Sequence, residues 1–165
     1  MTAAVHTSFP PVGNRQARIL ILGSMPGPAS LAKREYYAHP HNAFWAILEK
    51  HYRTRFRDYQ AKKRFLAKKR LALWDVLCSC ERRGAADAKI RKARPNDIAG
   101  FLRAHPGIQS VLFNGASAER YFLRWFKAQK VQCVRMPSTS PAYASLSFRK
   151  KYSIWVRALQ GKINP

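Results

Sequence analysis

Four short, largely apolar segments are spaced along the chain. They lie at residues 18–23, 71–77, 108–113 and 131–136. Apolar runs of this length are typical of strands that are buried on both faces of a parallel sheet. The pattern therefore predicts four strands, the first of which ends at Gly23.

Segments in which apolar residues recur at helical spacing separate these strands. Residues 42–52 are the clearest case, with Phe44, Trp45, Ile47 and Leu48 placed as in an amphipathic helix. Further helices are predicted within residues 53–70, over 95–102, from 116 to about 128, and around residues 154–159. The alternation predicts an α/β fold, a three-layer α/β/α sandwich with a four-stranded parallel sheet.

The remaining segments are rich in polar residues, proline and glycine, and we expect them to be loops. Residues 1–17 are predicted to form a loose N-terminal arm, and residues 18–165 a single domain with one core. The loops that follow the four strands are residues 24–30, 78–94, 114–115 and 137–147. Since ligands bind beyond the carboxyl ends of parallel strands, a functional site is expected where these loops meet.

The chain carries a large excess of positive charge. Its 165 residues include 31 Lys and Arg against eight Asp and Glu, a formal net charge of +23. Such an excess opposes compaction unless a polyanion offsets it, and the phosphates of nucleic acids are the commonest polyanionic partner. A basic surface that serves only solubility, or one that binds a membrane surface, is the alternative interpretation.

Cysteine content and hydropathy indicate where the protein works. Cys78, Cys80 and Cys133 are too few for a disulfide framework and lack the spacing of a zinc site. No signal peptide and no membrane span is recognisable. We therefore expect a soluble, cytoplasmic monomer with reduced thiols and without a metal or another cofactor.

Two segments resemble the motifs of a known enzyme family. Gly23-Ser-Met-Pro-Gly27, followed by Tyr36-Tyr-Ala-His-Pro-His-Asn-Ala-Phe-Trp45, is similar to the first motif region of the uracil-DNA glycosylase superfamily. Met136-Pro-Ser-Thr-Ser-Pro-Ala142 resembles its closing motif. Together with Leu73-Trp-Asp-Val-Leu77 and Leu112-Phe-Asn-Gly-Ala116, these segments most resemble the hypoxanthine-DNA (deoxyinosine) glycosylases.

The resemblance covers residues 18–156 and implies a monofunctional glycosylase acting on duplex DNA with a damaged base. Such an enzyme flips the base into a pocket and hydrolyses its bond to the sugar with water, which leaves an abasic site. Two alternatives stay open. One is a uracil or mismatch glycosylase, and the other is a basic nucleic-acid-binding module without catalysis.

The residue that positions the attacking water is the first candidate. Relatives carry an Asp, Asn or Glu inside the first motif, where this chain has Ser24 and Met25. The hypoxanthine branch uses an asparagine in the following segment, so the resemblance implies that Asn42 holds the water, with Ser24 contributing a hydrogen bond. The alternative is that Asn42 only caps the helix that follows it.

The base is expected to meet three further side chains and Met25. Tyr37 is the predicted stacking partner, unless it packs in the core. Asp75 interrupts an apolar strand and could accept from N1–H of hypoxanthine, or it could pair with Arg82 or Arg83. Asn114 is a second candidate for the base edge, with shaping the Asn-Gly turn as its alternative role.

The last loop and three cations are expected to contact the DNA backbone. Hydroxyl and amide groups of this loop suit phosphates, and its proline suits a wedge in the minor groove. The predicted contacts are Ser138, Thr139, Ser140, Pro141, Lys33, Arg149 and Lys150. Many relatives begin this motif with a histidine that stabilises the departing base, whereas this chain has Met136. Either help for the leaving group comes from elsewhere, or the enzyme is slow.

Overall fold

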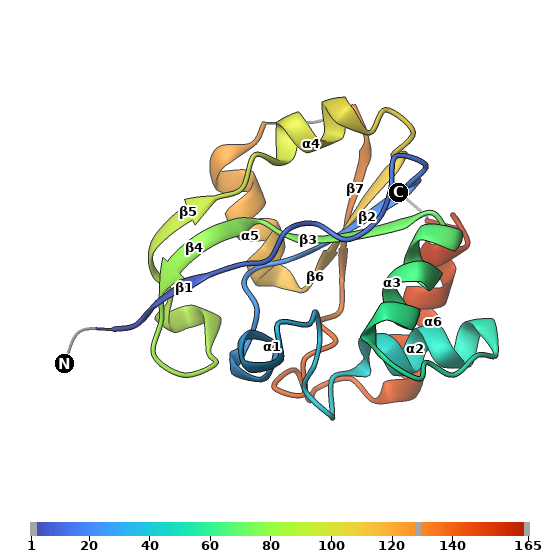
Figure 1. The fold of residues 1–165 in the computed structure, drawn as a ribbon, viewed down its shortest axis with the longest axis horizontal. Helices are drawn as coiled ribbons and strands as arrows, with labels where there is room; N and C mark the ends of the chain where they lie inside the picture. Colours follow the sequence, from blue (N-terminus) through green and yellow to red (C-terminus); the bar gives the residue numbers. More distant parts are fainter. Residues whose placement is uncertain (1–2, 128–129, 164–165) are drawn as a thin grey trace.

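A four-stranded parallel sheet forms the centre of the computed structural model, which describes residues 3–127 and 130–163 (Figure 1). Its strands are β2 (Ile19–Gly23), β3 (Leu71–Asp75), β6 (Ser110–Asn114) and β7 (Gln132–Met136), in the spatial order β3-β2-β6-β7. All neighbouring pairs are parallel. The four predicted strands are confirmed, although the second ends at Asp75 rather than at residue 77.

Helices cover both faces of this sheet, as the alternation of elements predicts. They are α1 (Pro28–Lys33), α2 (Ala43–Tyr52), α3 (Tyr59–Lys68), α4 (Ile98–Ala104), α5 (Ala116–Trp125) and α6 (Phe148–Leu159). Core side chains of α2, α3 and α6 pack on one face, and those of α4 and α5 on the other. The three-layer sandwich is therefore confirmed.

Three predictions about helices need correction. The helix expected over residues 95–102 is α4, which begins at Ile98, because Pro95 ends the strand β5 (Arg91–Pro95) and Asp97 caps the helix. A short helix, α1, begins at Pro28 inside the segment expected to be a loop, because proline at the first helical position has its φ already set. The helix that starts at Ala116 ends at Trp125, earlier than predicted, and Ala128 lies outside the described residues. Among the residues that the structure describes, no helix is long and apolar enough to span a membrane.

A second, antiparallel sheet was missed by the sequence interpretation. It consists of β1 (Val5–Thr7), β4 (Leu77–Glu81) and β5 (Arg91–Pro95) in the order β1-β4-β5, and a short 3-10 helix, η1 (Asp87–Lys89), lies between β4 and β5. The prediction of a polar loop over residues 78–94 is wrong. These strands are rich in polar residues because much of the sheet faces solvent, which hides the apolar alternation.

The N-terminal segment is also not a loose arm over its described part. β1 pairs with β4, and the backbone of Val12 pairs with that of Leu73. The indole of Trp74 donates to the carbonyl of Phe9 over 3.0 Å. These contacts tie the segment across the outer strand of the main sheet.

The order of the parallel strands creates a switch point. From β2 the chain goes to β3 on one side, and later returns to β6 on the other side. At such a point the loops leaving adjacent strands turn in opposite directions and open a crevice. Gly23 is aligned with Asp75 and Asn114 with Met136, so these four residues mark the carboxyl edge of the sheet.

Candidate active site

A cavity of about 470 Å³ opens at the carboxyl edge of the parallel sheet. It is walled by the first loop (residues 24–27), the segment before α2, the hairpin between β4 and β5, and the closing loop (residues 137–147). Ten of the predicted site residues line it: Ser24, Met25, Tyr37, Asn42, Asp75, Asn114, Ser138, Thr139, Ser140 and Pro141. Lys33, Arg149 and Lys150 are exposed outside it.

Gly23, Tyr37 and Asp75 form what we call the cavity floor. A methyl group built on Gly23 would lie 2.6 Å from Oδ1 of Asp75 and 3.4 Å from the hydroxyl of Tyr37, so glycine is required for this close approach. Asp75 is only 3% exposed. Among the described residues, its Oδ2 and the Tyr37 hydroxyl are buried polar atoms without a partner in hydrogen-bond geometry, although the Asn114 amide lies near enough to the Tyr37 hydroxyl to oppose the rise of its pKa.

The environment of Asp75 favours its neutral form. Burial, reinforced by the nearby Asp87 carboxylate, raises the pKa of Asp75 to about 8, and the guanidinium of Arg82 opposes this shift. Orphaned buried polar groups of this kind are uncommon in folded proteins and point to a ligand that completes them.

The two adjacent tyrosines point to different places. Tyr36 is 2% exposed and lies in the core with Phe9. Tyr37 adopts a left-handed backbone conformation, with φ of 54°, which is rare for a bulky residue and is found mainly where surrounding structure enforces it. Its ring lies 4.4 Å from that of Phe44, centroid to centroid. Thus Tyr37 is held rigidly against the helix and lines the cavity.

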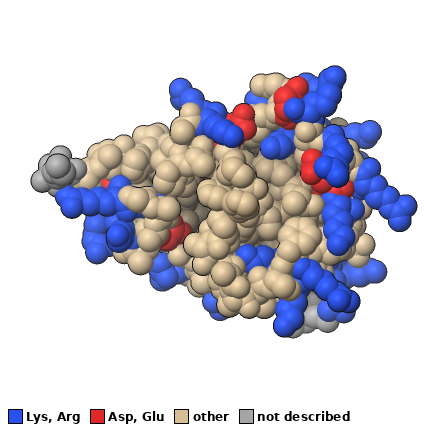
Figure 2. All heavy atoms as spheres, turned by 90° about the horizontal axis from the view of Figure 1, so that it is seen from below, with Lys and Arg blue, Asp and Glu red and all other residues tan. Residues whose placement is uncertain are grey.

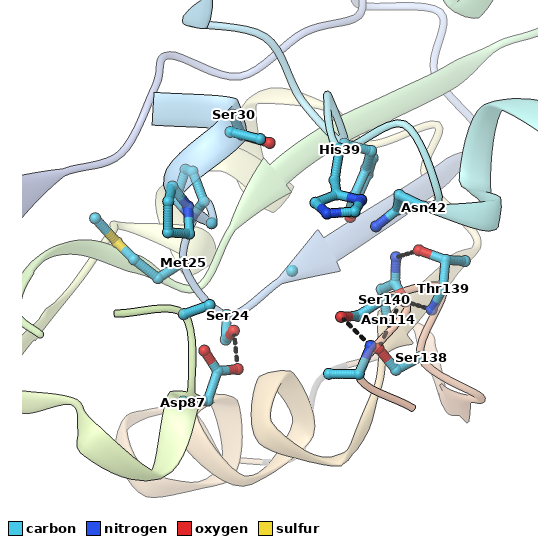
Figure 3. A pocket seen from close by; sticks show the side chains of 18 of the residues that line it. Ser24, Met25, Ser30, His39, Asn42, Asp87, Asn114, Ser138, Thr139 and Ser140 are labelled. Carbon is cyan, nitrogen blue, oxygen red and sulfur yellow. Dashed lines mark hydrogen bonds between the residues drawn. The ribbon is translucent and has the colours of Figure 1, made fainter. Parts of the chain in front are cut away.

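Asn42 caps α2, which is the alternative role that the sequence left open for it. Its Oδ1 accepts a hydrogen bond of 3.0 Å from the backbone N–H of Phe44. This fixes the orientation of the amide, and Figure 3 shows the amide nitrogen directed from the start of α2 toward the cavity. Asn42 therefore presents two N–H donors to the cavity, while its oxygen keeps one lone pair beyond the cap.

Ser24 belongs to a network that the sequence interpretation missed. Its hydroxyl donates to Oδ2 of Asp87 over 2.5 Å. Arg82, which is 2% exposed, contacts Oδ1 of Asp87 at 3.4 Å and donates to the carbonyl of Pro26 over 2.5 Å. This network ties the hairpin of the small sheet to the first loop. Arg82 thus forms its ion pair with Asp87, rather than with Asp75.

The scarcity of acidic residues is the signal that could have revealed Asp87. Five of the other six acids have structural partners: Asp58 and Asp97 cap helices, Glu49 accepts from the N–H of Phe56, and Glu81 and Glu119 pair with Lys92 and Arg135. Asp75 and Asp87 line the cavity. Two of only eight acids in a chain of net charge +23 therefore meet at one site.

Asn114 holds the closing loop. Its Nδ2 donates to Oγ1 of Thr139, and its Oδ1 accepts from the N–H of Thr139, both over 2.9 Å. The carbonyl of Thr139 in turn accepts from the N–H of Ala43, the first residue of α2. Thr139 is 1% exposed. Hence Asn114 and Thr139 join β6, the closing loop and α2, and both sides of the Asn114 amide have partners.

Met25 lies in the hydrophobic core behind the first loop. Its side chain is 6% exposed and packs with the cluster under α4 and α5. Figure 3 shows it pointing away from Asn42 and Asn114. Met25 therefore borders the cavity from the core, and its side chain is not directed toward the polar groups that are expected to meet the base.

Lys151 is a further residue that the sequence interpretation missed. It lies in α6, is 5% exposed, and donates from Nζ to the carbonyls of Tyr143 and Ser140 over 2.6 and 3.3 Å. Burial lowers the pKa of its ammonium group. From its place in α6, the lysine thus fixes the conformation of the closing loop.

Replacing Lys151 with methionine is expected to lower the free energy of unfolding by about 1–3 kcal/mol, because two loop carbonyls lose their donor. Its exposed neighbour provides the control: Lys150→Met should stay within about 0.5 kcal/mol of the wild type. Urea unfolding of both variants measures the difference. Equal stability of the two would show that Lys151 does not support the loop.

Basic side chains surround the cavity face. Figure 2 views the side that carries α1 and the closing loop, and shows Lys and Arg around the rim with mostly uncharged residues in the middle. The exposed cations predicted to bind phosphates, Lys33, Arg149 and Lys150, lie on α1 and α6 beside this face. A rim of this sign attracts a polyanion to the cavity.

The family follows from comparison with known proteins. Residues 10–160 match the Uracil DNA glycosylase superfamily. The chain therefore belongs to this superfamily, as its motifs indicated, and it is a DNA glycosylase.

Two relatives and one solved structure give more detail. Proteins named hypoxanthine DNA glycosylase from Methanosarcina barkeri and Methanosarcina acetivorans are 36% and 34% identical to this chain over 115 and 119 residues. These matches cover 68% and 71% of this chain, and 73% and 75% of the relatives. A solution NMR structure from M. acetivorans, of a candidate uracil DNA glycosylase, has a TM-score of 0.81 at 28% identity, covering 95% of this chain and 99% of that one.

Proposed function

We propose that this enzyme excises hypoxanthine from deoxyinosine sites in duplex DNA and leaves an abasic site. The observation that carries the proposal is the cavity floor, where Asp75 and Tyr37 leave buried polar atoms unpaired at the switch point of the sheet. A cavity of about 470 Å³ suits a nucleoside-sized ligand. The names of the two Methanosarcina relatives support hypoxanthine as that ligand.

The basic rim and the closing loop would hold the DNA. Each phosphate neutralised by a lysine or arginine releases a counterion and makes the slope of log affinity against log salt more negative by about 0.9. The exposed tip of the closing loop, Pro141 and Ala142, is followed by Tyr143, which is 40% exposed. These side chains can occupy the gap left by the flipped nucleotide. The proposed monomeric state is compatible with one cavity serving one lesion.

The flipped base would stack on Tyr37 and direct its polar edge to Asp75. The reaction passes through a sugar with the character of an oxocarbenium ion. The glycosidic bond therefore breaks ahead of the attack by water, and the water needs only weak activation. Asn42 is the proposed holder of that water, because its amide N–H groups face the cavity. An amide oxygen has two lone pairs, so the cap and a contact with water or with the sugar cation can coexist.

Uracil is the second candidate substrate. Its N3–H and adjacent carbonyl oxygen form the same donor–acceptor edge as N1–H and O6 of hypoxanthine, so Asp75 could contact either base. The solved structure of the candidate uracil DNA glycosylase favours this reading.

The experiment that separates them uses four duplexes that differ at one position, which holds deoxyinosine, deoxyuridine, deoxyxanthosine or deoxyadenosine. Each is incubated with excess protein and then cleaved with alkali at abasic sites. Cleavage that is fastest at deoxyinosine supports the proposal. Faster cleavage at deoxyuridine would replace hypoxanthine with uracil as the main substrate.

Removing the aromatic ring of Tyr37 tests the stacking role. A base–aromatic stack contributes about 1–3 kcal/mol, so Tyr37→Leu should weaken productive binding about 10- to 100-fold. Tyr37→Phe keeps the ring and should keep most of the affinity. The protein concentration that gives half the maximal single-turnover rate reports the difference. If the leucine variant saturates like the wild type, the base does not stack on Tyr37.

A further inference from the structure

The cavity contains two carboxyl groups whose surroundings differ. Asp87 has an arginine and a hydroxyl as partners and is partly exposed. Asp75 is 3% exposed, and its Oδ2 has no partner among the described residues. Within residues 3–127 and 130–163 the ion pairs are Arg82–Asp87, Lys92–Glu81 and Arg135–Glu119, none of which includes Asp75. Two carboxyl groups held in different environments commonly divide acid and base roles between them.

The groups that face Asp75 do not compensate a negative charge. Tyr36, Tyr37 and Tyr59 lie near it, and their hydroxyl groups are neutral because burial raises the pKa of each one. Asp87 repels a charge on Asp75, and the attraction of Arg82 is shared with Asp87. An uncompensated carboxylate at this depth would be costly, so the neutral acid is favoured.

We propose that Asp75 works as a neutral carboxylic acid whose O–H donates to the carbonyl oxygen of the flipped base and so assists its departure. This inference rests on the proposed function, since it takes a base with a lactam edge as the ligand. Asp75 would then stabilise the departing base. In many relatives a histidine at the start of the closing motif has this role, whereas this chain has Met136.

The carboxylic acid of Asp75 and the polar edge of hypoxanthine are complementary. A neutral carboxylic acid presents one donor and one acceptor side by side, which match O6 and N1–H of hypoxanthine. An ionised carboxylate would instead place an acceptor against O6. A neutral acid can also pair with adenine, so this contact accelerates departure, and selectivity comes from the easier flipping of a mismatched base.

The hydrogen bond strengthens as the reaction proceeds. When the C1′–N9 bond breaks, its electron pair moves into the purine, and part of the negative charge reaches O6. The water oxygen bonds to C1′ and loses a proton, and the departing purine gains one. Asp75 therefore ends the reaction in the state in which it began. A preorganised donor aimed at developing charge contributes about 10²–10³ in rate.

Nuclear magnetic resonance of the free protein tests the state of Asp75 without any substrate. With ¹³C-labelled aspartate, the carboxyl resonance absent from Asp75→Asn identifies the residue. We expect this resonance to titrate with a midpoint near pH 8. A midpoint below about pH 5, in the ordinary range for aspartate, would overturn the proposal.

The pH dependence of excision tests the role. With deoxyinosine duplex under single-turnover conditions, the wild-type rate should fall about tenfold per pH unit above the pKa of Asp75, because the ionised form is inactive. Asp75→Asn keeps the donor and acceptor but cannot ionise. It should retain the rate at pH 7 within about tenfold and lose the alkaline decline, since the amide replaces the neutral acid.

Asp75→Leu separates the contact from a structural role. Below the pKa of Asp75 it should be about 100-fold slower than the wild type, and its rate should show no alkaline decline, while it binds an abasic duplex normally, because only the donor to the base is missing. A wild-type rate that rises with pH, or an alkaline decline that persists in Asp75→Asn, would overturn the proposal. If the wild type excises no hypoxanthine at all, the proposed function fails, and the titration still decides whether Asp75 is neutral.

Discussion

Asn42→Ser is expected to reduce hypoxanthine excision by about 100- to 1,000-fold while leaving the fold intact. Serine caps a helix about as well as asparagine, so the N–H of Phe44 keeps its acceptor. What the variant loses is the pair of N–H donors that face the cavity. Losing one preorganised donor in an active site costs about this factor in rate.

Asn42→Ala is the matched comparison, because it removes the cap as well as the amide. It should show the same loss of excision and in addition a decrease of about 1 kcal/mol in the free energy of unfolding. Single-turnover rates, thermal unfolding and binding to an abasic duplex are measured for both variants. If the serine variant cuts at the wild-type rate and the alanine variant does not, Asn42 serves only as a cap.

Gly23→Ala should nearly abolish excision. The added methyl group would lie 2.6 Å from Oδ1 of Asp75, so the carboxyl or the end of β2 must move. A displacement on the order of 1 Å at a reacting site can cost about 100-fold in rate, and overpacking costs about 1–3 kcal/mol of stability.

Gly27→Ala provides the control from the same loop. A methyl group on Gly27 meets no atom within 4 Å, and its φ of −73° suits any residue. This variant should unfold like the wild type, so a lower stability of Gly23→Ala can be assigned to the contact with Asp75. Normal excision by Gly23→Ala would show that the cavity floor is not where the base lies.

The main sheet could be predicted because its strands are buried on both faces. Such strands appear in a sequence as uninterrupted apolar runs, and β2 and β6 are clear examples. The small sheet lacks that signal. β5 consists of Arg91–Pro95, a segment with three cations and mostly exposed side chains, whose pairing with β4 depends on backbone hydrogen bonds. Neither its composition nor its periodicity distinguishes it from a loop.

The site was predictable where a motif marks a strand end. Tyr37, Asn42 and Asp75 are brought together by the loops that follow β2 and β3, as the topology of a parallel sheet requires. Asp87 and Arg82 reach the cavity from the unpredicted hairpin, so no sequence spacing relates them to Ser24. Lys151 acts from the far side of the closing loop, where a helical lysine normally faces solvent.

The sequence also left open which role each polar residue has, and the hydrogen bonds narrow that choice. The amide of Asn114 is engaged on both sides by Thr139, which explains an asparagine before the turn at Gly115. Gly115 itself has φ of 101° and lies against Ser138, so a side chain would be strained there. These details depend on the approach of β6 to the closing loop, which no local pattern encodes.

The most direct test is the structure of the protein bound to a duplex that carries 2′-fluoro-deoxyinosine, a substrate that resists cleavage. We expect the hypoxanthine to lie outside the helix, with its ring on Tyr37 and its N1–O6 edge at Asp75. A complex in which the base remains stacked in the duplex, or enters the protein away from the cavity at the ends of β2, β3 and β6, would contradict it.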